Sequence, residues 1–130
     1  MANRSKDWMR QAEADLRHAH HALKDEDFEW SCFAAHQAAE KALKAVFMHL
    51  GMEAWGHSLS PLLGNLQEKI KIPKALTDQA KVLDRHYIPT RYPNGFDSGA
   101  PADYYGAEDA NQAIHCAEAL IGFCRSQISK

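Results

Sequence analysis

Apolar residues recur every three or four positions through three long segments of this chain, a spacing typical of amphipathic helices. Residues 5–24 carry one such stripe, residues 28–50 a second and residues 107–128 a third. The second segment is followed by Gly51, and glycine readily adopts the left-handed conformation in which many helices end. No segment alternates apolar and polar residues with period two, as a half-buried strand would. The sequence therefore predicts an all-α fold.

Two shorter helices are expected between the long ones. The first begins at Ser58 or Ser60, and the next runs from about Pro73 to His86. Residues 87–106 are rich in proline, glycine and aromatic residues, which predicts an ordered loop packed onto the helices. A length of 130 residues fits one domain, so we expect residues 1–130 to form a single domain, and short connections favour antiparallel neighbours within it. Its predicted architecture is an up-and-down antiparallel helical bundle of four main helices plus a short extra helix.

Charge and composition restrict the partners of this chain. Its 130 residues carry a net charge of -2, so no global basic field grips nucleic acid and any phosphate site must be local. The start of the chain lacks the apolar region of a signal peptide, and no apolar stretch approaches the ~20 residues that cross a bilayer. We therefore expect a cytoplasmic protein with no membrane partner, whose three cysteines stay free and serve packing.

The helix predicted over residues 28–50 carries large side chains on two sides. Opposite its apolar stripe, a second face mixes aromatic with polar residues: Trp30, Phe33, Gln37, Glu40, Lys41, Lys44 and Phe47. A helix with one solvated face shows only polar groups there. We therefore expect this helix to be covered on both sides, either by the loop of this chain or by a second copy in a homodimer.

The most specific local feature is the loop around Arg91. This arginine lies between Pro89 and Pro93, which restrict the backbone on both sides of it. A guanidinium held in this way grips a phosphate or a carboxylate with two parallel hydrogen bonds. The structural alternative is that Arg91 pairs with a carboxylate of the bundle, such as Glu40, and only pins the loop.

Other polar residues are candidates for the same site. Gln37, Lys41 and Lys44 align along one side of their helix, where they either add positive charge beside Arg91 or form a solvated face in which Glu40 pairs with Lys44. His57 precedes the third helix. It either caps this helix or approaches a ligand at the helix N-terminus.

No set of residues has the spacing of a metal or cofactor site. His18 and His21 lie three residues apart on a polar helix face, without a partner pair at zinc-like spacing. There is no glycine-rich phosphate loop and no Gly-x-Ser-x-Gly motif. We therefore expect no metal and no bound cofactor.

Taken in order, several fragments make this chain similar to the HEPN domain family of higher eukaryotes and prokaryotes. The resemblance covers nearly the whole chain. Its fragments are Trp8, Ala12, Asp15-Leu16 and Ala19 in the first helix, the run Phe33–Ala45, then His57-Ser58-Leu59, Leu83 with Tyr87, Arg91-Tyr92-Pro93, and Tyr104 with Ala107-Glu108-Asp109-Ala110. The resemblance implies a helical bundle, usually dimeric, often encoded beside a minimal nucleotidyltransferase in a two-gene toxin-antitoxin or nucleotide-handling system.

Many HEPN members are metal-independent ribonucleases that carry an arginine followed four to six residues later by a histidine. In this chain no histidine follows Arg91 before His115, so the sequence resembles the branch that lacks the nuclease motif. The leading hypothesis is therefore a non-catalytic binding module with a cleft for a nucleotide or another phosphorylated ligand. The residues expected to line it are Gln37, Lys41, Lys44, His57, Arg91 and Tyr92, with Tyr92 or Tyr104 stacking on a base.

Two alternatives remain open at this stage. One is a ribonuclease toxin with a rearranged site, in which His57 approaches Arg91 in space and supplies the base that RNA cleavage needs. The other is an interaction subunit in which the same residues only shape the dimer or dock a nucleotidyltransferase partner.

Overall fold

The computed structural model describes residues 3–130 and contains only helices, turns and loops there, so the predicted all-α fold is confirmed. The helices are α1 (Ser5–Lys24), α2 (Phe28–His49), α3 (Leu59–Leu66), α4 (Lys74–Asp84), α5 (Pro101–Tyr104) and α6 (Ala107–Ile128), with a 3-10 turn η1 (Pro93–Gly95). The first and last long helices have the predicted bounds. The single turns η1 and α5 lie in the segment that was predicted as a loop.

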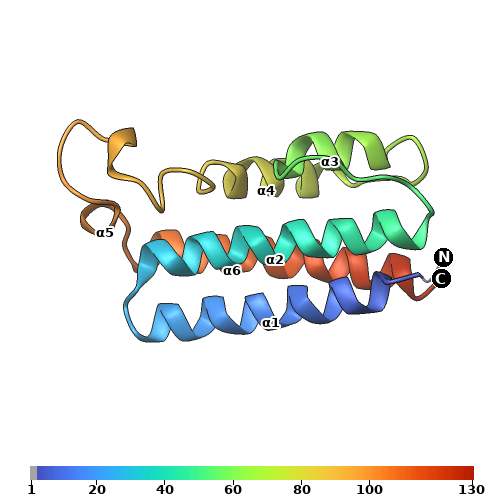
Figure 1. Ribbon diagram of the computed structural model, residues 1–130, viewed down its shortest axis with the longest axis horizontal. Helices are drawn as coiled ribbons and strands as arrows, with labels where there is room; N and C mark the ends of the chain where they lie inside the picture. The colour runs from blue at the N-terminus through green and yellow to red at the C-terminus, as the bar shows by residue number, and fades with distance from the viewer. Residues whose placement is uncertain (1–2) are drawn as a thin grey trace.

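The helices form an up-and-down bundle in which α2 is central (Figure 1). Helix α1 packs against α2 and α6, while α3 and α4 lie on the side of α2 away from α1 (Figure 1). Together α3 and α4 take the place of the fourth long helix of a bundle. The start of α1 and the end of α6 lie at one end of the molecule, and α5 lies at the other (Figure 1).

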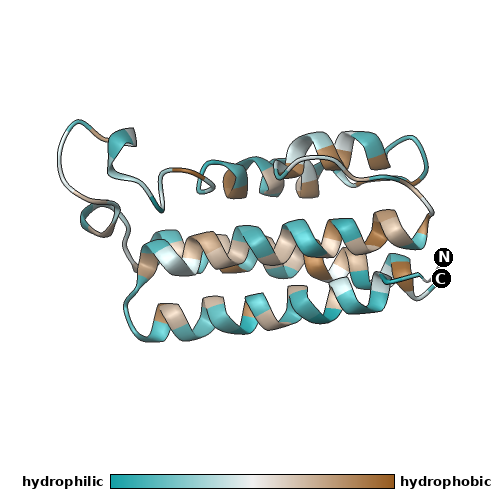
Figure 2. Ribbon diagram, in the orientation of Figure 1, coloured by the Kyte–Doolittle hydropathy of each residue, from teal (hydrophilic) through white to brown (hydrophobic). Residues whose placement is uncertain are grey.

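Small residues allow the long helices to approach closely. Alanines fill the contact faces, and fully buried examples include Ala12, Ala19, Ala35, Ala38, Ala113 and Ala117. At one crossing the hydroxyl of Ser31 donates a 2.8 Å hydrogen bond to the carbonyl of Ala19, which joins α2 to α1. The outer edge of α1 is hydrophilic along most of its length (Figure 2).

Helix α2 is covered on both sides, as its two-faced sequence predicted. Phe47 is 1% exposed and belongs to the core rather than to an outer face. Phe33 is half-buried, and Trp30 remains 49% exposed. The cover over Phe47 therefore comes from this chain itself. The helix ends as expected: Gly51 has φ +69°, and the amide of Met52 donates to the carbonyl of Phe47.

The three cysteines are buried and free, in agreement with their expected packing role. Burial, with a smaller contribution from the charges of Asp109 and Glu29, raises the pKa of the Cys32 thiol to about 12. Burial raises the pKa of Cys124 to about 12 as well. Over residues 3–130, none of the helices combines the length and the apolar character needed to cross a bilayer.

Candidate functional site

The carboxylate of Asp84, at the end of α4, joins three helices. It accepts hydrogen bonds from the backbone amides of Leu59 (2.7 Å) and Ser60 (3.0 Å) and from the Ser60 hydroxyl (3.0 Å), which caps the start of α3. The Nε2 of the fully buried His36, on α2, lies 3.2 Å from the same carboxylate. Asp84 therefore supplies the cap that the sequence analysis had considered for His57.

The pKa of Asp84 reflects two opposed effects. Burial raises it, but the hydrogen bonds from His36, Leu59 and Ser60 together outweigh burial and lower the pKa below its ordinary value of 3.8. The carboxylate is thus held in its charged form, which is the form that caps α3 and accepts a hydrogen bond from His36.

Tyr87, just beyond α4, is the centre of an aromatic cluster. Its ring centroid lies 5.0 Å from that of His36 and 6.1 Å from that of Phe33, both on α2. The His57 ring stacks on it with centroids 5.7 Å apart and an interplanar angle of 13°. Because Asp84 fixes His36, and His36 packs on Tyr87, the position of this ring is set by the bundle core.

Arg91 is anchored on this cluster and not on a carboxylate. Its Nε and Nη2 donate hydrogen bonds of 2.9 and 2.7 Å to the carbonyl of Tyr87. The guanidinium carbon lies 4.4 Å from the ring centroid of Phe33, 4.6 Å from that of Tyr87 and 5.1 Å from that of Tyr92. Within residues 3–130, no carboxylate forms an ion pair with Arg91, so the pairing with Glu40 considered above does not occur.

Glu40 lies buried on α2 beneath the exposed His57. One oxygen, Oε2, accepts hydrogen bonds from Lys44 Nζ (2.8 Å) and from His57 Nδ1 (2.9 Å). The other, Oε1, is buried without a hydrogen-bond partner in the described part of the chain. An ionised carboxylate can only accept, so Nδ1 of His57 donates in this contact, and Nε2 has no hydrogen-bond partner within residues 3–130. The His57 side chain is 60% exposed.

The predicted site residues are thus only partly brought together. Arg91, His57 and Lys44 are connected through Tyr87 and Glu40, so the guanidinium does not lie directly against the lysine as the sequence analysis pictured. Gln37 contacts His36 at 3.3 Å. Lys41 turns toward α1 and pairs with Asp15.

Tyr104 lies apart from these residues. Its ring stacks on Phe96 with centroids 4.2 Å apart, and its hydroxyl donates to the carbonyl of Ser98. The contacts of the cluster depend instead on His36 and Asp84, which the sequence analysis did not single out. A histidine within the alanine-rich stretch of α2 was the available signal, since a buried imidazole needs a polar partner.

Comparisons with known proteins agree with this architecture. The sequence model of the HEPN domain family matches residues 5–127 of this chain. The Methanocaldococcus jannaschii protein named "Putative toxin MJ1304" is 28% identical over 88% of this chain and 81% of its own length.

Several solved structures are also similar over nearly their full length. TT1696 from Thermus thermophilus superposes with a TM-score of 0.94 at 44% identity, covering 97% of this chain and 99% of its own. An archaeal HEPN homologue superposes with a TM-score of 0.84 at 38% identity, covering 98% of this chain and 99% of its own. A HEPN domain protein from Thermotoga maritima superposes with a TM-score of 0.80 at 38% identity, covering 95% of this chain and 98% of its own. This chain belongs to the HEPN family.

Proposed function

We propose that this HEPN chain is the toxin-like component of a two-gene system and acts as a binding subunit for a nucleotide or another phosphorylated ligand. The observation that carries the proposal is the state of Arg91. Its guanidinium is fixed by two hydrogen bonds to the Tyr87 carbonyl and lies against three aromatic rings. Among residues 3–130 it has no carboxylate to balance its charge.

A guanidinium of this kind is suited to bind an anion. Its orientation is already fixed, so little conformational entropy is lost when a phosphate binds. Nη1 is not used in any hydrogen bond within residues 3–130, and it remains available to a ligand. Tyr92 is 48% exposed next to it and offers a ring on which a base can stack.

The proposed assembly is a homodimer that pairs with a minimal nucleotidyltransferase. Support comes from the family resemblance and from the relative whose name describes a toxin. Around Arg91 three large side chains, Trp30, Ile88 and Tyr92, are each about half exposed. Exposed apolar groups of this size are typical of interfaces. Sedimentation that shows only monomers at micromolar concentration would remove the dimer from the proposal.

Replacing Arg91 with alanine is expected to weaken nucleotide binding by about 10- to 100-fold, because a charge-assisted hydrogen bond to the phosphate is lost. Isothermal titration with a panel of nucleoside mono-, di- and triphosphates measures this. Arg91→Lys keeps the charge without the planar fork and should give an intermediate affinity. Arg85→Ala removes an exposed arginine with no ion pair in the described chain and serves as the control. Equal binding by wild type and Arg91→Ala, or none by wild type, contradicts the proposal.

A second candidate function, ribonuclease activity, is favoured by the Glu40–His57 pair. A buried carboxylate that holds Nδ1–H of an exposed histidine leaves Nε2 oriented as a proton acceptor. His57 and Arg91 also contact the same ring, that of Tyr87. In such a reaction Nε2 would take the proton of a ribose 2′-hydroxyl as that oxygen attacks the adjacent phosphorus. The 5′-oxygen would leave with a proton from water.

If this chain cleaves RNA, His57→Ala is expected to lower the rate by about 100-fold or more, since general-base catalysis contributes that much. Glu40→Gln should cause a smaller loss, because it weakens the orientation of His57 without removing the imidazole. A fluorogenic ribo-oligonucleotide measures cleavage, and a 2′-O-methyl oligonucleotide, which cannot be cleaved by this route, measures binding. His20→Ala, an exposed histidine on α1, is the control. Cleavage that survives in His57→Ala excludes this role.

A further inference from the structure

The acidic side chains of α1 are all in ion pairs, whereas its lysines and arginines are not. Each of its three carboxylates is paired with a cation from outside the helix. Asp7 pairs with Arg4 at 3.1 Å, Glu13 with Arg125 at 2.8 Å, and Asp15 with Lys41. The acidic side chains of α1 are therefore used to hold the amino-terminal segment, α6 and α2.

The four cations of α1 have no such partners. Lys6, Arg10, Arg17 and Lys24 are all exposed, and within residues 3–130 none of them lies in an ion pair or a side-chain hydrogen bond. Their spacings of four, seven and seven residues place them along one side of the helix. At 1.5 Å per residue this row, which we name the α1 stripe, extends for about 27 Å.

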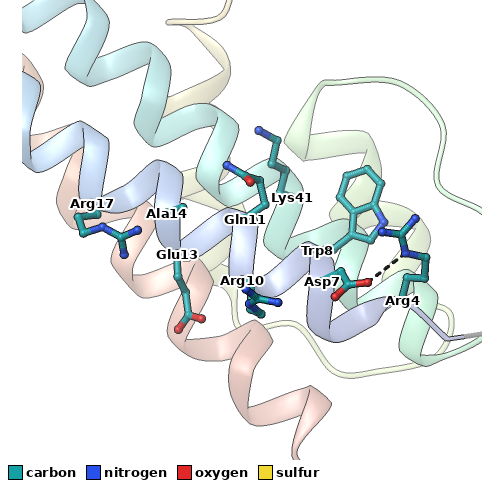
Figure 3. A pocket seen from close by; sticks show the side chains of 9 residues that line it. All are labelled: Arg4, Asp7, Trp8, Arg10, Gln11, Glu13, Ala14, Arg17 and Lys41. Carbon is teal, nitrogen blue, oxygen red and sulfur yellow. Dashed lines mark hydrogen bonds and ion pairs between the residues drawn. The ribbon is translucent and has the colours of Figure 1, made fainter.

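A shallow hollow of about 760 Å³ adjoins the stripe. Arg4, Arg10 and Arg17 contribute to its lining together with Lys41 (Figure 3). The acidic residues in the same lining, Asp7 and Glu13, are those already paired with arginines. Because Arg4 and Lys41 are themselves paired, with Asp7 and Asp15, the positive charge left available in the hollow is that of Arg10 and Arg17, although the whole chain carries a net charge of -2.

We propose that the α1 stripe binds the sugar-phosphate backbone of a nucleic acid. Four cations in a row can each meet a phosphate, and the release of counterions then supplies the binding free energy. Helix α1 lies on the side of α2 opposite α3 and α4 (Figure 1). The stripe is therefore a surface separate from the one around Arg91, and the proposal does not depend on the ligand proposed there.

The composition of this face favours a nucleic-acid backbone over a protein or a lipid surface. A protein interface needs buried apolar or aromatic anchors, and so does a helix that lies in a membrane surface. The large exposed apolar side chains of the described chain are Trp30, Met48, Leu50, Trp55, Ile88, Tyr92 and Tyr104, and none of them is on α1. Trp8 of α1 lines the hollow but is partly buried against the core. Binding to a phosphate backbone requires no such anchor.

The salt dependence of RNA binding tests this inference. A fluorescently labelled RNA hairpin is titrated with the protein, and anisotropy is recorded over a series of potassium chloride concentrations. We expect Arg10→Gln/Arg17→Gln to weaken binding at least tenfold and to lower the slope of log K against log salt concentration by about 1.5 to 2. Lys69→Gln/Lys71→Gln removes the same charge from exposed lysines outside the stripe and is expected to leave the slope unchanged.

Three results would overturn the inference. They are a wild-type protein that does not bind the hairpin even at low salt, a stripe variant that binds as tightly as wild type, and equal losses in the stripe variant and its control. Polyglutamate of matched charge provides the protein-like competitor, and displacement of RNA at equal charge concentration would contradict a preference for nucleic acid. Arg10→Gln/Arg17→Gln is expected to bind nucleotides in the isothermal titration as wild type does, which separates this surface from the proposed nucleotide site.

Discussion

Phe47→Ala is expected to lower the free energy of unfolding by about 3–5 kcal/mol. Phe47 is 1% exposed and is among the largest fully buried side chains of the core. Its removal loses the transfer free energy of the ring and leaves a cavity that the neighbouring helices fill only in part. A domain of this size is stable by about 5–15 kcal/mol, so this loss is at least about a fifth of the total.

Urea unfolding followed by circular dichroism measures this effect, and the midpoint of thermal unfolding should fall by about 10–20 °C. Met48→Ala is the matched control because Met48 is the next residue of α2 and is 40% exposed. Its replacement is expected to cost less than about 1 kcal/mol. Similar losses at both positions would mean that Phe47 is not the core residue described here.

Phe47 also shows how far the sequence predicts this fold. Helical periodicity placed α1 and α6 correctly, because each has a single apolar stripe facing the bundle. In α2 periodicity gave the bounds to within one residue and placed Phe47 on a second face that was expected to be covered, but it left open whether this chain or a second copy covers it. The residues that cover that face come from an earlier segment, as Asp15 does for Lys41, and from later ones, as His57 does for Glu40, and no local pattern in α2 indicates where they pack.

The candidate site, like the fold, was predicted from the sequence only in part. The loop around Arg91 was recognised from its two prolines and its aromatic neighbours, which are adjacent in sequence. Its interactions were not, because they depend on pairs distant in sequence. His36 meets Asp84, 48 residues away, and Lys41 meets Asp15, 26 residues away. Spacing along one helix predicts pairs such as Glu40 with Lys44, but it carries no information on partners from another helix.

Asp84→Ala is expected to lower the free energy of unfolding by about 3–5 kcal/mol. The substitution leaves the Nε2 of the buried His36 and the amides of Leu59 and Ser60 without their acceptor. Asp78→Ala is the control on the same helix, since its ion pair with Lys74 is exposed and contributes about 0.5 kcal/mol or less. Urea unfolding of the two variants compares them, and equal midpoints would contradict the role given to Asp84.

The pH dependence of stability separates the contribution of the Asp84 charge from that of its side-chain volume. Its pKa in the folded protein is lowered below the ordinary 3.8, because the hydrogen bonds it accepts outweigh the effect of burial. The folded state therefore binds this proton less readily than the unfolded state does. The resulting stabilisation is fully present above about pH 4 and is lost as the pH falls through the folded pKa. Asp84→Asn should show a shallower loss of stability over this acid range, whereas parallel curves for the two proteins would exclude the linkage.

The same substitution tests whether the core positions the Arg91 surface. Asp84 does not touch Arg91, but it fixes His36, whose ring packs on Tyr87, and the carbonyl of Tyr87 holds the guanidinium. Asp84→Asn keeps one acceptor oxygen and should remain folded at neutral pH with weakened nucleotide binding. Unchanged affinity in a folded Asp84→Asn protein would mean that the loop orients Arg91 by its own prolines and aromatic rings, without help from α2.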